Sequence, residues 1–267
     1  MKMLLQGKTA IVHGGGGAIG GAAARAFARE GARVFLAGRT RTKLDAVARD
    51  IVANGGTAEV AEVDALDEQS IETYTNAVAS KAGRIDIMLN AVGIVHVQGT
   101  PFAELSFNDY AHPIAAYTRT QFIAAKAAAR HMAKQASGVI LLISTPGSRL
   151  PGTGYLGYGV TCAATEGFSR LLAAELAPSG VRVVCLMPHA IPEASAMGSH
   201  SREVFAPAAA RAGVTVDEML AGAATGTPLK RLPTLAEVGD VAAFVASDRA
   251  GSMTGTVVNM SCGVLVD

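Results

Sequence analysis

Residues 9–30 read TAIVHGGGGAIGGAAARAFARE. A short apolar run comes first, four consecutive glycines follow at 14–17, and an alanine-rich segment with helical spacing comes directly after them. A strand, a glycine turn and a helix N-terminus in this order form an anion site, because the backbone can approach a pyrophosphate whose charge meets unpaired N–H groups. A glycine run alone is typical of a flexible turn, but the strand before it and the helix after it favour nucleotide binding.

The alternation of strand and helix continues along the chain. Apolar runs that do not alternate predict strands buried on both faces, as in a parallel sheet; they lie at 9–12, 34–37, 60–63, 85–89, 139–143, 181–187 and 257–260. Segments with helical spacing lie between the first six of them, at 22–30, 44–53, 71–82, 107–135 and 158–177, and glycine closes the first three. The sequence therefore predicts a doubly wound α/β sheet, a Rossmann fold, in a single domain over residues 1–267.

Residues 188–230 differ from the rest of the chain. They contain several prolines and no strand signal, which predicts a helical lid over a ligand site after the sixth strand. A surface helix pair without function is the alternative. Apolar residues of this segment suit a hydrophobic ligand: Met197, Val204, Phe205, Met219 and Leu220.

Composition excludes several classes of protein. Half of the 267 residues are apolar and 17% are charged, which excludes a disordered chain. Lys plus Arg (23) and Asp plus Glu (22) nearly balance, so no nucleic acid or acidic membrane is expected as a partner. Cys162, Cys185 and Cys262 fit neither a disulfide framework nor a metal site. Without an apolar stretch long enough for a signal peptide or a membrane helix, the sequence predicts a cytoplasmic protein.

Several motifs resemble those of the short-chain dehydrogenase/reductase family. Gly14, Ala18 and Gly20 have the spacing of its TGxxxGxG motif, the run 90–93 reads NAVG where the family has NNAG, and Tyr158 stands at its tyrosine. The resemblance runs the whole length of the chain and implies an oxidoreductase with a nicotinamide cofactor and a small-molecule substrate. It assigns these residues to the cofactor: Gly14, Gly16, Gly17, Ala18, Ile19, Gly20, Asp64, Ala65, Asn90, Ala91, Val92, Pro188, His189 and Ile191. Asp64 would reach the adenine and Asn90 would flank the ribose.

The resemblance also implies a homo-oligomer, either a dimer or a tetramer. Small residues at 124–129 and 163–167 let helices of two subunits approach closely. Packing of these faces within the subunit is the alternative.

The end of the second predicted strand bears on the choice of cofactor. The run 37–41 reads AGRTR, without the carboxylate that would hold the ribose 2′-hydroxyl of NAD(H). Arg39 and Arg41, with Thr40 between them and Lys43 nearby, suit a 2′-phosphate instead. NADP(H) is therefore favoured over NAD(H), with solvated residues opening a helix as the alternative.

The family's proton relay is altered here. In the family a tyrosine protonates the substrate oxygen, a serine thirteen residues earlier binds that oxygen, and a lysine four residues later lowers the tyrosine pKa. The same count from Tyr158 gives Thr145, which follows Ser144, as the hydroxyl donor, and Cys162 in place of the lysine. Tyr117 takes the place of the relay asparagine on the preceding helix. Tyr158, Thr145 and Ser144 are the predicted catalytic residues.

The loss of the lysine predicts a direction of reaction. Lowering a phenol pKa from ~10 by about three units takes roughly 4 kcal/mol, which a neutral thiol cannot supply. We therefore expect Tyr158 to act as a general acid in reduction, and alcohol oxidation to be impaired. Cys162 is expected to pack, with a thiolate nucleophile as the alternative.

Three histidines, His96, His189 and His200, are candidates to replace part of the relay. His189 is preferred, because it follows Pro188 in the family's PG position. The family's threonine after that motif falls at Glu193.

Three functions fit these observations. The first is an NADP(H)-dependent oxidoreductase acting on a carbonyl or activated alkene of a small hydrophobic substrate. The others are a nucleotide-binding relative without redox turnover that regulates a pathway, and a non-redox isomerase or cyclase. The first is favoured, because the cofactor motifs are largely kept and hydride transfer belongs mainly to the cofactor.

Overall fold

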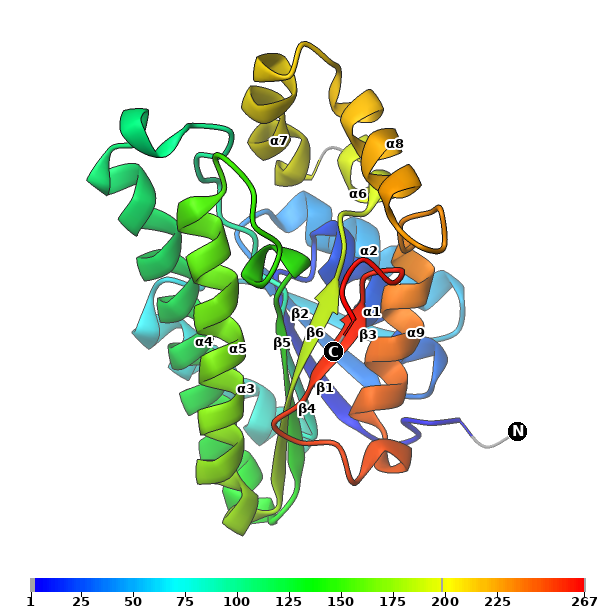
Figure 1. Ribbon diagram of the computed structural model, residues 1–267. Helices are drawn as coiled ribbons and strands as arrows, with labels where there is room; N and C mark the ends of the chain where they lie inside the picture. Colours follow the sequence, from blue (N-terminus) through cyan, green and yellow to red (C-terminus); the bar gives the residue numbers. More distant parts are fainter. Residues whose placement is uncertain (1–2, 198, 267) are drawn as a thin grey trace.

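The computed structural model describes residues 3–197 and 199–266 and contains one sheet of seven parallel strands (Figure 1). The strand order is β3-β2-β1-β4-β5-β6-β7. The strands are β1 Thr9–His13, β2 Arg33–Gly38, β3 Thr57–Glu62, β4 Ile87–Asn90, β5 Gly138–Ile143, β6 Val181–Pro188 and β7 Val257–Met260. Each overlaps an apolar run found in the sequence, and the predicted doubly wound parallel sheet is confirmed.

Helices cover both faces of the sheet (Figure 1). One face carries α1 Ala18–Arg29, α2 Arg41–Ala53 and α9 Leu235–Ala246; the other carries α3 Glu68–Ala82, α4 Phe107–Gln135 and α5 Leu156–Leu176. In β1, Ala10 and Val12 pack toward the first layer and Ile11 toward the second. Because successive side chains point to opposite faces, both sets must be apolar, and this explains the uninterrupted apolar runs.

Three further helices follow β6 at the carboxyl edge of the sheet (Figure 1). They are α6 Pro192–Ala196, α7 His200–Arg211 and α8 Val216–Gly226, and Ala209 of α7 packs in one apolar cluster with Val216 and Leu220 of α8. They form the helical segment predicted at 188–230, of which Gly198 lies outside the described residues. The described part of the chain also contains four short 3-10 helices: Phe102–Glu104, Pro146–Ser148, Ala177–Ser179 and Asp248–Ala250.

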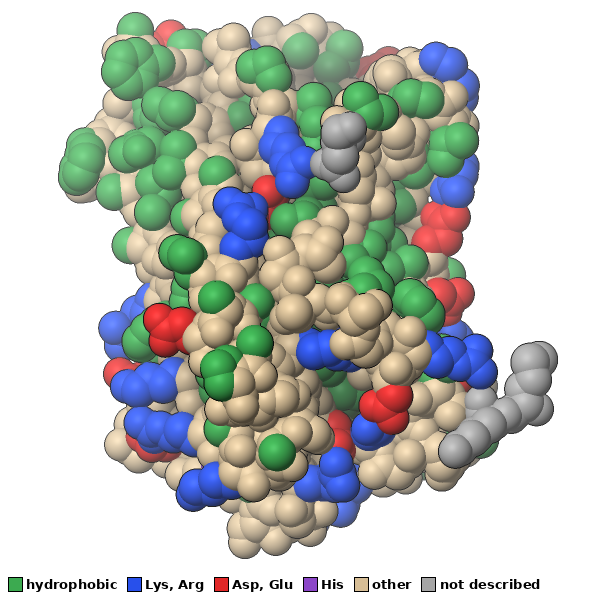
Figure 2. All heavy atoms as spheres, turned by 60° about the horizontal axis from the view of Figure 1, so that its bottom comes forward, with side chains coloured by type: hydrophobic (Ala, Val, Ile, Leu, Met, Phe, Trp, Pro, Cys, Tyr) green, Lys and Arg blue, Asp and Glu red, His purple; other side chains and the backbone are tan. Residues whose placement is uncertain are grey.

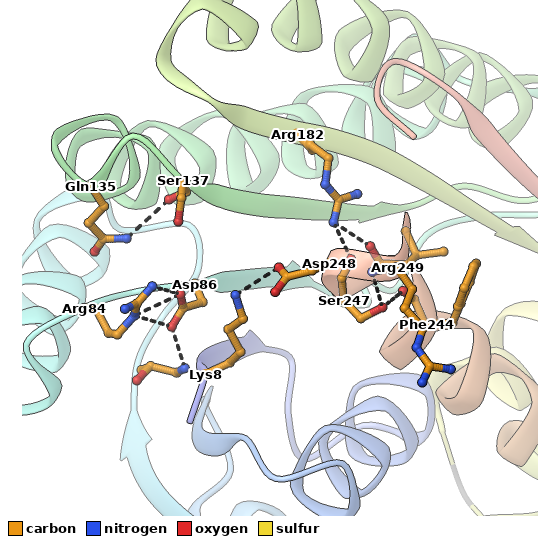
Figure 3. Close-up of polar contacts among 12 residues, drawn as sticks. Lys8, Arg84, Asp86, Gln135, Ser137, Arg182, Phe244, Ser247, Asp248 and Arg249 are labelled. Carbon is orange, nitrogen blue, oxygen red and sulfur yellow. Dashed lines mark hydrogen bonds and ion pairs between the residues drawn. The ribbon is translucent and has the colours of Figure 1, made fainter. Parts of the chain in front are cut away.

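A polar network closes the amino edge of the sheet (Figure 3). Asp86 accepts from the backbone N–H of Thr9 at 2.8 Å and also binds the Arg84 guanidinium. Arg182 donates to the carbonyls of Val245 and Ser247 at 2.9 and 3.1 Å. These contacts tie β1 to the segment before β4, and β6 to the end of α9. Doubly wound folds bind ligands at the opposite edge, where the carboxyl ends of the strands lie.

Charged side chains of both signs are intermingled on the face shown in Figure 2, and apolar side chains gather at its upper left. Within residues 3–197 and 199–266, no group of His, Cys, Asp or Glu is arranged to hold a metal ion, and no helix is long and apolar enough to cross a bilayer. The three cysteines are unpaired thiols.

Candidate active site

A cleft of about 340 Å³ opens at the carboxyl edge of the sheet. Its walls come from the glycine loop, the ends of β2 and β3, the loop after β4, and the segment after β6 with α7. Most of the residues predicted to bind the cofactor line it: Gly14, Gly16, Gly17, Ala18, Ile19, Arg39, Thr40, Asp64, Ala65, Ala91, Val92, Pro188, His189 and Ile191. The three that do not are Gly20, Arg41 and Asn90.

The glycine loop forms a cradle that fits a pyrophosphate. Gly14 has a φ of +75°, and a Cβ atom there would lie 2.4 Å from the carbonyl oxygen of Ala91. Gly20 packs beneath the loop, since its Cβ would lie 2.3 Å from the Gly14 carbonyl oxygen. Helix α1 begins at Ala18 after Gly17, which supplies no side-chain cap, so its first-turn N–H groups are available to an anion.

The basic residues at the end of β2 have different environments. Arg39 is exposed, lines the cleft, and makes no ion pair or hydrogen bond with another residue in the described part of the chain. Arg41 lies outside the cleft lining and pairs with Asp45, at 2.9 Å. Lys43 joins Arg39 in the lining, so two of the three basic residues at this strand end border the cleft and Arg41 does not.

Asn90 shapes the loop after β4 from beneath. Its side chain is buried, accepts from the N–H of Val92 at 3.1 Å and donates to the Thr120 hydroxyl at 3.3 Å. The Asn90 side chain therefore lies outside the cleft lining, and its place beside the cofactor ribose stays a prediction. Its amide holds Val92, which does line the cleft.

Tyr158 and Thr145 both line the cleft. The Tyr158 hydroxyl contacts the side chains of both Thr145 and Cys162, and the Thr145 hydroxyl lies 3.3 Å from the Cys162 sulfur. Cys162 follows Tyr158 by one helical turn of α5, on the same face. Burial raises the Tyr158 pKa well above its usual 10 and also raises the pKa of the Cys162 thiol. Both groups therefore hold their protons at neutral pH.

Comparisons with known proteins agree with this geometry. A family model described as enoyl-(acyl carrier protein) reductase matches residues 16–265, nearly the whole chain. The chain is a short-chain dehydrogenase/reductase.

The relatives of this short-chain dehydrogenase/reductase are oxidoreductases by name. It is 30% identical to oxidoreductase UcpA of Escherichia coli (strain K12) over 94% of this chain and 92% of that protein. It is 28% identical to the 7α-hydroxysteroid dehydrogenase of Clostridium sardiniense, over 97% and 94% of the two chains. A solved 7α-hydroxysteroid dehydrogenase complexed with NADH and 7-oxo glycochenodeoxycholic acid has a TM-score of 0.85 at 26% identity, covering 98% of this chain and 96% of its own. The chain is therefore an oxidoreductase, and its fold implies a nicotinamide cofactor.

Ser144 has a supporting position in this short-chain dehydrogenase/reductase. It is buried outside the cleft lining, and its hydroxyl donates to the Glu166 carboxylate at 3.1 Å. Ser148 donates to the same carboxylate at 2.5 Å. Ser144 thus helps to fix the strand end that carries Thr145, whereas the sequence had grouped it with the catalytic residues.

The residue beside Tyr158 differs from the one preferred from the sequence. His189 lines the cleft and accepts from the Ala190 N–H at 2.6 Å, but His96 stacks on the Tyr158 ring, with centroids 4.5 Å apart. Tyr117 takes part through the backbone: its hydroxyl accepts from the Ile94 N–H at 3.1 Å and donates to the Ile94 carbonyl at 3.3 Å.

The α6–α7 segment covers the middle of the cleft. His200 rests against Gly93, where an added Cβ would lie 2.2 Å from the His200 ring, and Phe205 also lines the cleft. Met197, by contrast, is exposed to solvent. Glu193 points away from the cleft and accepts from the Leu235 N–H at the start of α9, so its role is to cap that helix.

Proposed function

We propose that this protein is an NADP(H)-dependent reductase of a carbonyl or activated alkene in a small hydrophobic substrate. The observation that carries the proposal is that Tyr158 and Thr145 meet in the same cleft as the glycine cradle. The cradle would hold the pyrophosphate of a nicotinamide cofactor, which when bound would supply the hydride. Thr145 donates a hydrogen bond to the substrate oxygen, and Tyr158 donates the proton.

The direction of reaction follows from the charge state of Tyr158. Cys162 occupies the position at which the family resemblance places a lysine, and no lysine occurs between Lys134 and Lys230. Burial raises the pKa of the phenol, no cationic side chain among the described residues opposes this shift, and the phenol therefore keeps its proton at neutral pH. A protonated phenol serves reduction, whereas alcohol oxidation needs the phenolate as a base. We infer that this is an atypical member of the family that works as a reductase.

The preference for NADP(H) is carried by Arg39. This guanidinium borders the cleft without an ionic partner among the described residues, and the residues around it, 37–41, include no carboxylate. A solved relative is complexed with NADH, so the shared fold alone does not distinguish NADH from NADPH. The distinction depends on the charges near the ribose 2′ position, which here are those of Arg39 and its neighbours.

Calorimetry tests the cofactor preference. We expect NADPH to bind about tenfold more tightly than NADH, equivalent to about 1.4 kcal/mol. The variant R39A should lose this advantage, while the matched control R41A should keep it because Arg41 is paired with Asp45. Equal or tighter binding of NADH by the unaltered protein contradicts the preference.

The substrate class follows from the cleft lining. The cleft that contains Tyr158 is also lined by apolar side chains, among them Ile94, Ile191 and Phe205. One relative is named for a hydroxysteroid. We infer a hydrophobic ketone, quinone or enone. The names of the relatives favour redox turnover over a regulatory or isomerase role.

A dimer or tetramer is part of the proposal. The alanines Ala124, Ala125 and Ala128 of α4 are buried inside the subunit, so this small-residue face packs internally. The outer surface of α4 and α5 instead exposes Phe122 (53%) and Leu171 (72%) beside an apolar groove. We propose that these exposed side chains, rather than the alanines, form the contact with a second subunit.

A further inference from the structure

His96 lies flat on the phenol ring of Tyr158. The ring planes differ by 17°, the centroids are 4.5 Å apart, and His96 is 7% exposed. His96 comes from the loop after β4 and Tyr158 from α5. A histidine that the sequence ranked below His189 therefore covers one face of the proposed proton donor.

Two hydrogen bonds define the charge state of His96. Its Nδ1 lies 2.7 Å from the Ile94 carbonyl oxygen, which can only accept, so Nδ1 carries a hydrogen. Its Nε2 lies 2.8 Å from the Gln98 amide nitrogen, which can only donate, so Nε2 presents its lone pair. The ring is therefore the neutral Nδ1–H tautomer. Tyr117 anchors this arrangement, because its hydroxyl binds both backbone groups of Ile94.

The other half of the Gln98 amide has no partner. Its Oε1 atom is buried without a hydrogen bond in the described part of the molecule, and Gln98 is 1% exposed. A half-turn of the amide exchanges this oxygen with the amide nitrogen and brings it to His96 Nε2. That oxygen would then accept from a protonated Nε2, while Nδ1 continues to donate to Ile94. Both charge states of His96 thus have a complete set of ring hydrogen bonds.

We propose that His96 and Gln98 form a proton-loading pair that places a positive charge on the face of Tyr158 at acid pH. His96 is then a positioning residue, and the inference rests on the proposed reductase function. An imidazolium against the phenol favours the phenolate, which makes Tyr158 a stronger acid toward the substrate oxygen. In the reaction the Tyr158 O–H bond breaks and the substrate O–H bond forms, solvent returns a proton to the phenolate, and His96 keeps its own proton.

The surroundings of His96 place its protonation on the acid side of neutrality. Burial lowers its pKa below the usual 6.5, the Ile94 carbonyl opposes this shift, and charge on His200 or His112 adds to it. The groups that bear on it are His112 and Tyr117 from α4, Tyr158 from α5 and His200 from α7. No carboxylate contributes to its pKa, so an introduced one should have a large effect.

Nitrogen NMR of the imidazoles in the cofactor-free protein tests the pair without reference to turnover. We expect His96 to be the Nδ1–H tautomer at about pH 7.5 and to gain its proton below pH 6.5, with the Tyr158 ring carbon shift following the same titration. In Q98E the carboxylate should hold the imidazolium and raise the midpoint by about one pH unit. The proposal is wrong if His96 is the Nε2–H tautomer, or if the Tyr158 carbon shift does not change as His96 titrates.

The rate of reduction gives the second reading. Between about pH 7.5 and pH 5 the turnover number should rise about fivefold in the unaltered protein, and the rise should move to higher pH in Q98E. In H96F, which keeps a flat ring on Tyr158 but takes up no proton, the rise should disappear. The control H131F changes a histidine bonded to Asn76, outside the cleft lining, and should leave the rise unchanged. A rise that persists in H96F contradicts the proposal. If no substrate is reduced, the proposed reductase function is wrong. The NMR titrations still show whether His96 and Gln98 act as a proton-loading pair.

Discussion

Acid should destabilise this protein through His13, the last residue of β1. The side chain is buried at the floor of the cleft, and neither ring nitrogen has a hydrogen-bond partner among the described residues. The nearby Tyr74 ring lies 6.1 Å away, and its own hydroxyl also lacks a partner there. A proton on His13 would therefore be a buried charge without compensation.

The size and sign of the effect follow from proton linkage. Burial lowers the pKa of His13 from 6.5 to about 4 in the folded protein, while the unfolded chain keeps the ordinary value. Between these two values the unfolded state binds more protons, so the free energy of unfolding falls as the pH falls. The stability is fully present above pH 6.5, and by about pH 4 the loss amounts to about 3 kcal/mol.

Urea unfolding at about pH 7.5 and about pH 4 measures this loss. The variant H13T carries the threonine that the family has at this position, and its stability relative to the unaltered protein should improve by about 3 kcal/mol at the lower pH. The control Y74F keeps the imidazole and should keep the original pH dependence. If the unaltered protein and H13T lose stability in parallel, His13 is not the cause and the reasoning fails.

Three further predictions concern the cradle, the relay and assembly. G14A should weaken cofactor binding about tenfold or more in calorimetry, because its Cβ would lie 2.4 Å from a carbonyl oxygen. The control G213A has a similar positive φ but no close contact, and it should bind the cofactor normally. C162K should raise alcohol oxidation relative to reduction near neutral pH, since an ammonium one turn beyond the phenol lowers its pKa; an unchanged ratio in a folded variant contradicts this. L171D should yield monomers by light scattering, with the equally polar change V52D on α2 as control; monomeric unaltered protein refutes the interface.

The fold was predictable because each strand and helix leaves its pattern within a short stretch of the sequence. Strands buried on both faces produce short apolar runs, and the glycine cradle with its following helix lies within residues 9–30. Thr145 and Tyr158 also came from the sequence, since a fixed spacing relates them to a known motif. Their meeting in the cleft agrees with that spacing.

The remainder of the site depends on contacts between distant segments. Neither His96 nor Tyr158 carries a local signal that the two rings stack, and the sequence therefore favoured His189. The directions of Asn90 and Ser144 depend on their buried partners, which no spacing reveals. The pairing of Arg41 with Asp45 was open to prediction, because residues four apart on a helix face each other.

Consumption of NADPH by the unaltered protein and by Y158F tests the central proposal most directly. Absorbance would be followed near neutral pH with a panel of hydrophobic ketones, quinones and enones, and cofactor binding by both proteins would be measured by calorimetry. The account predicts turnover of at least one substrate by the unaltered protein and a loss of about a hundredfold or more in Y158F, with NADPH binding retained. Tight NADPH binding without turnover of any substrate, or equal turnover by Y158F, would contradict it.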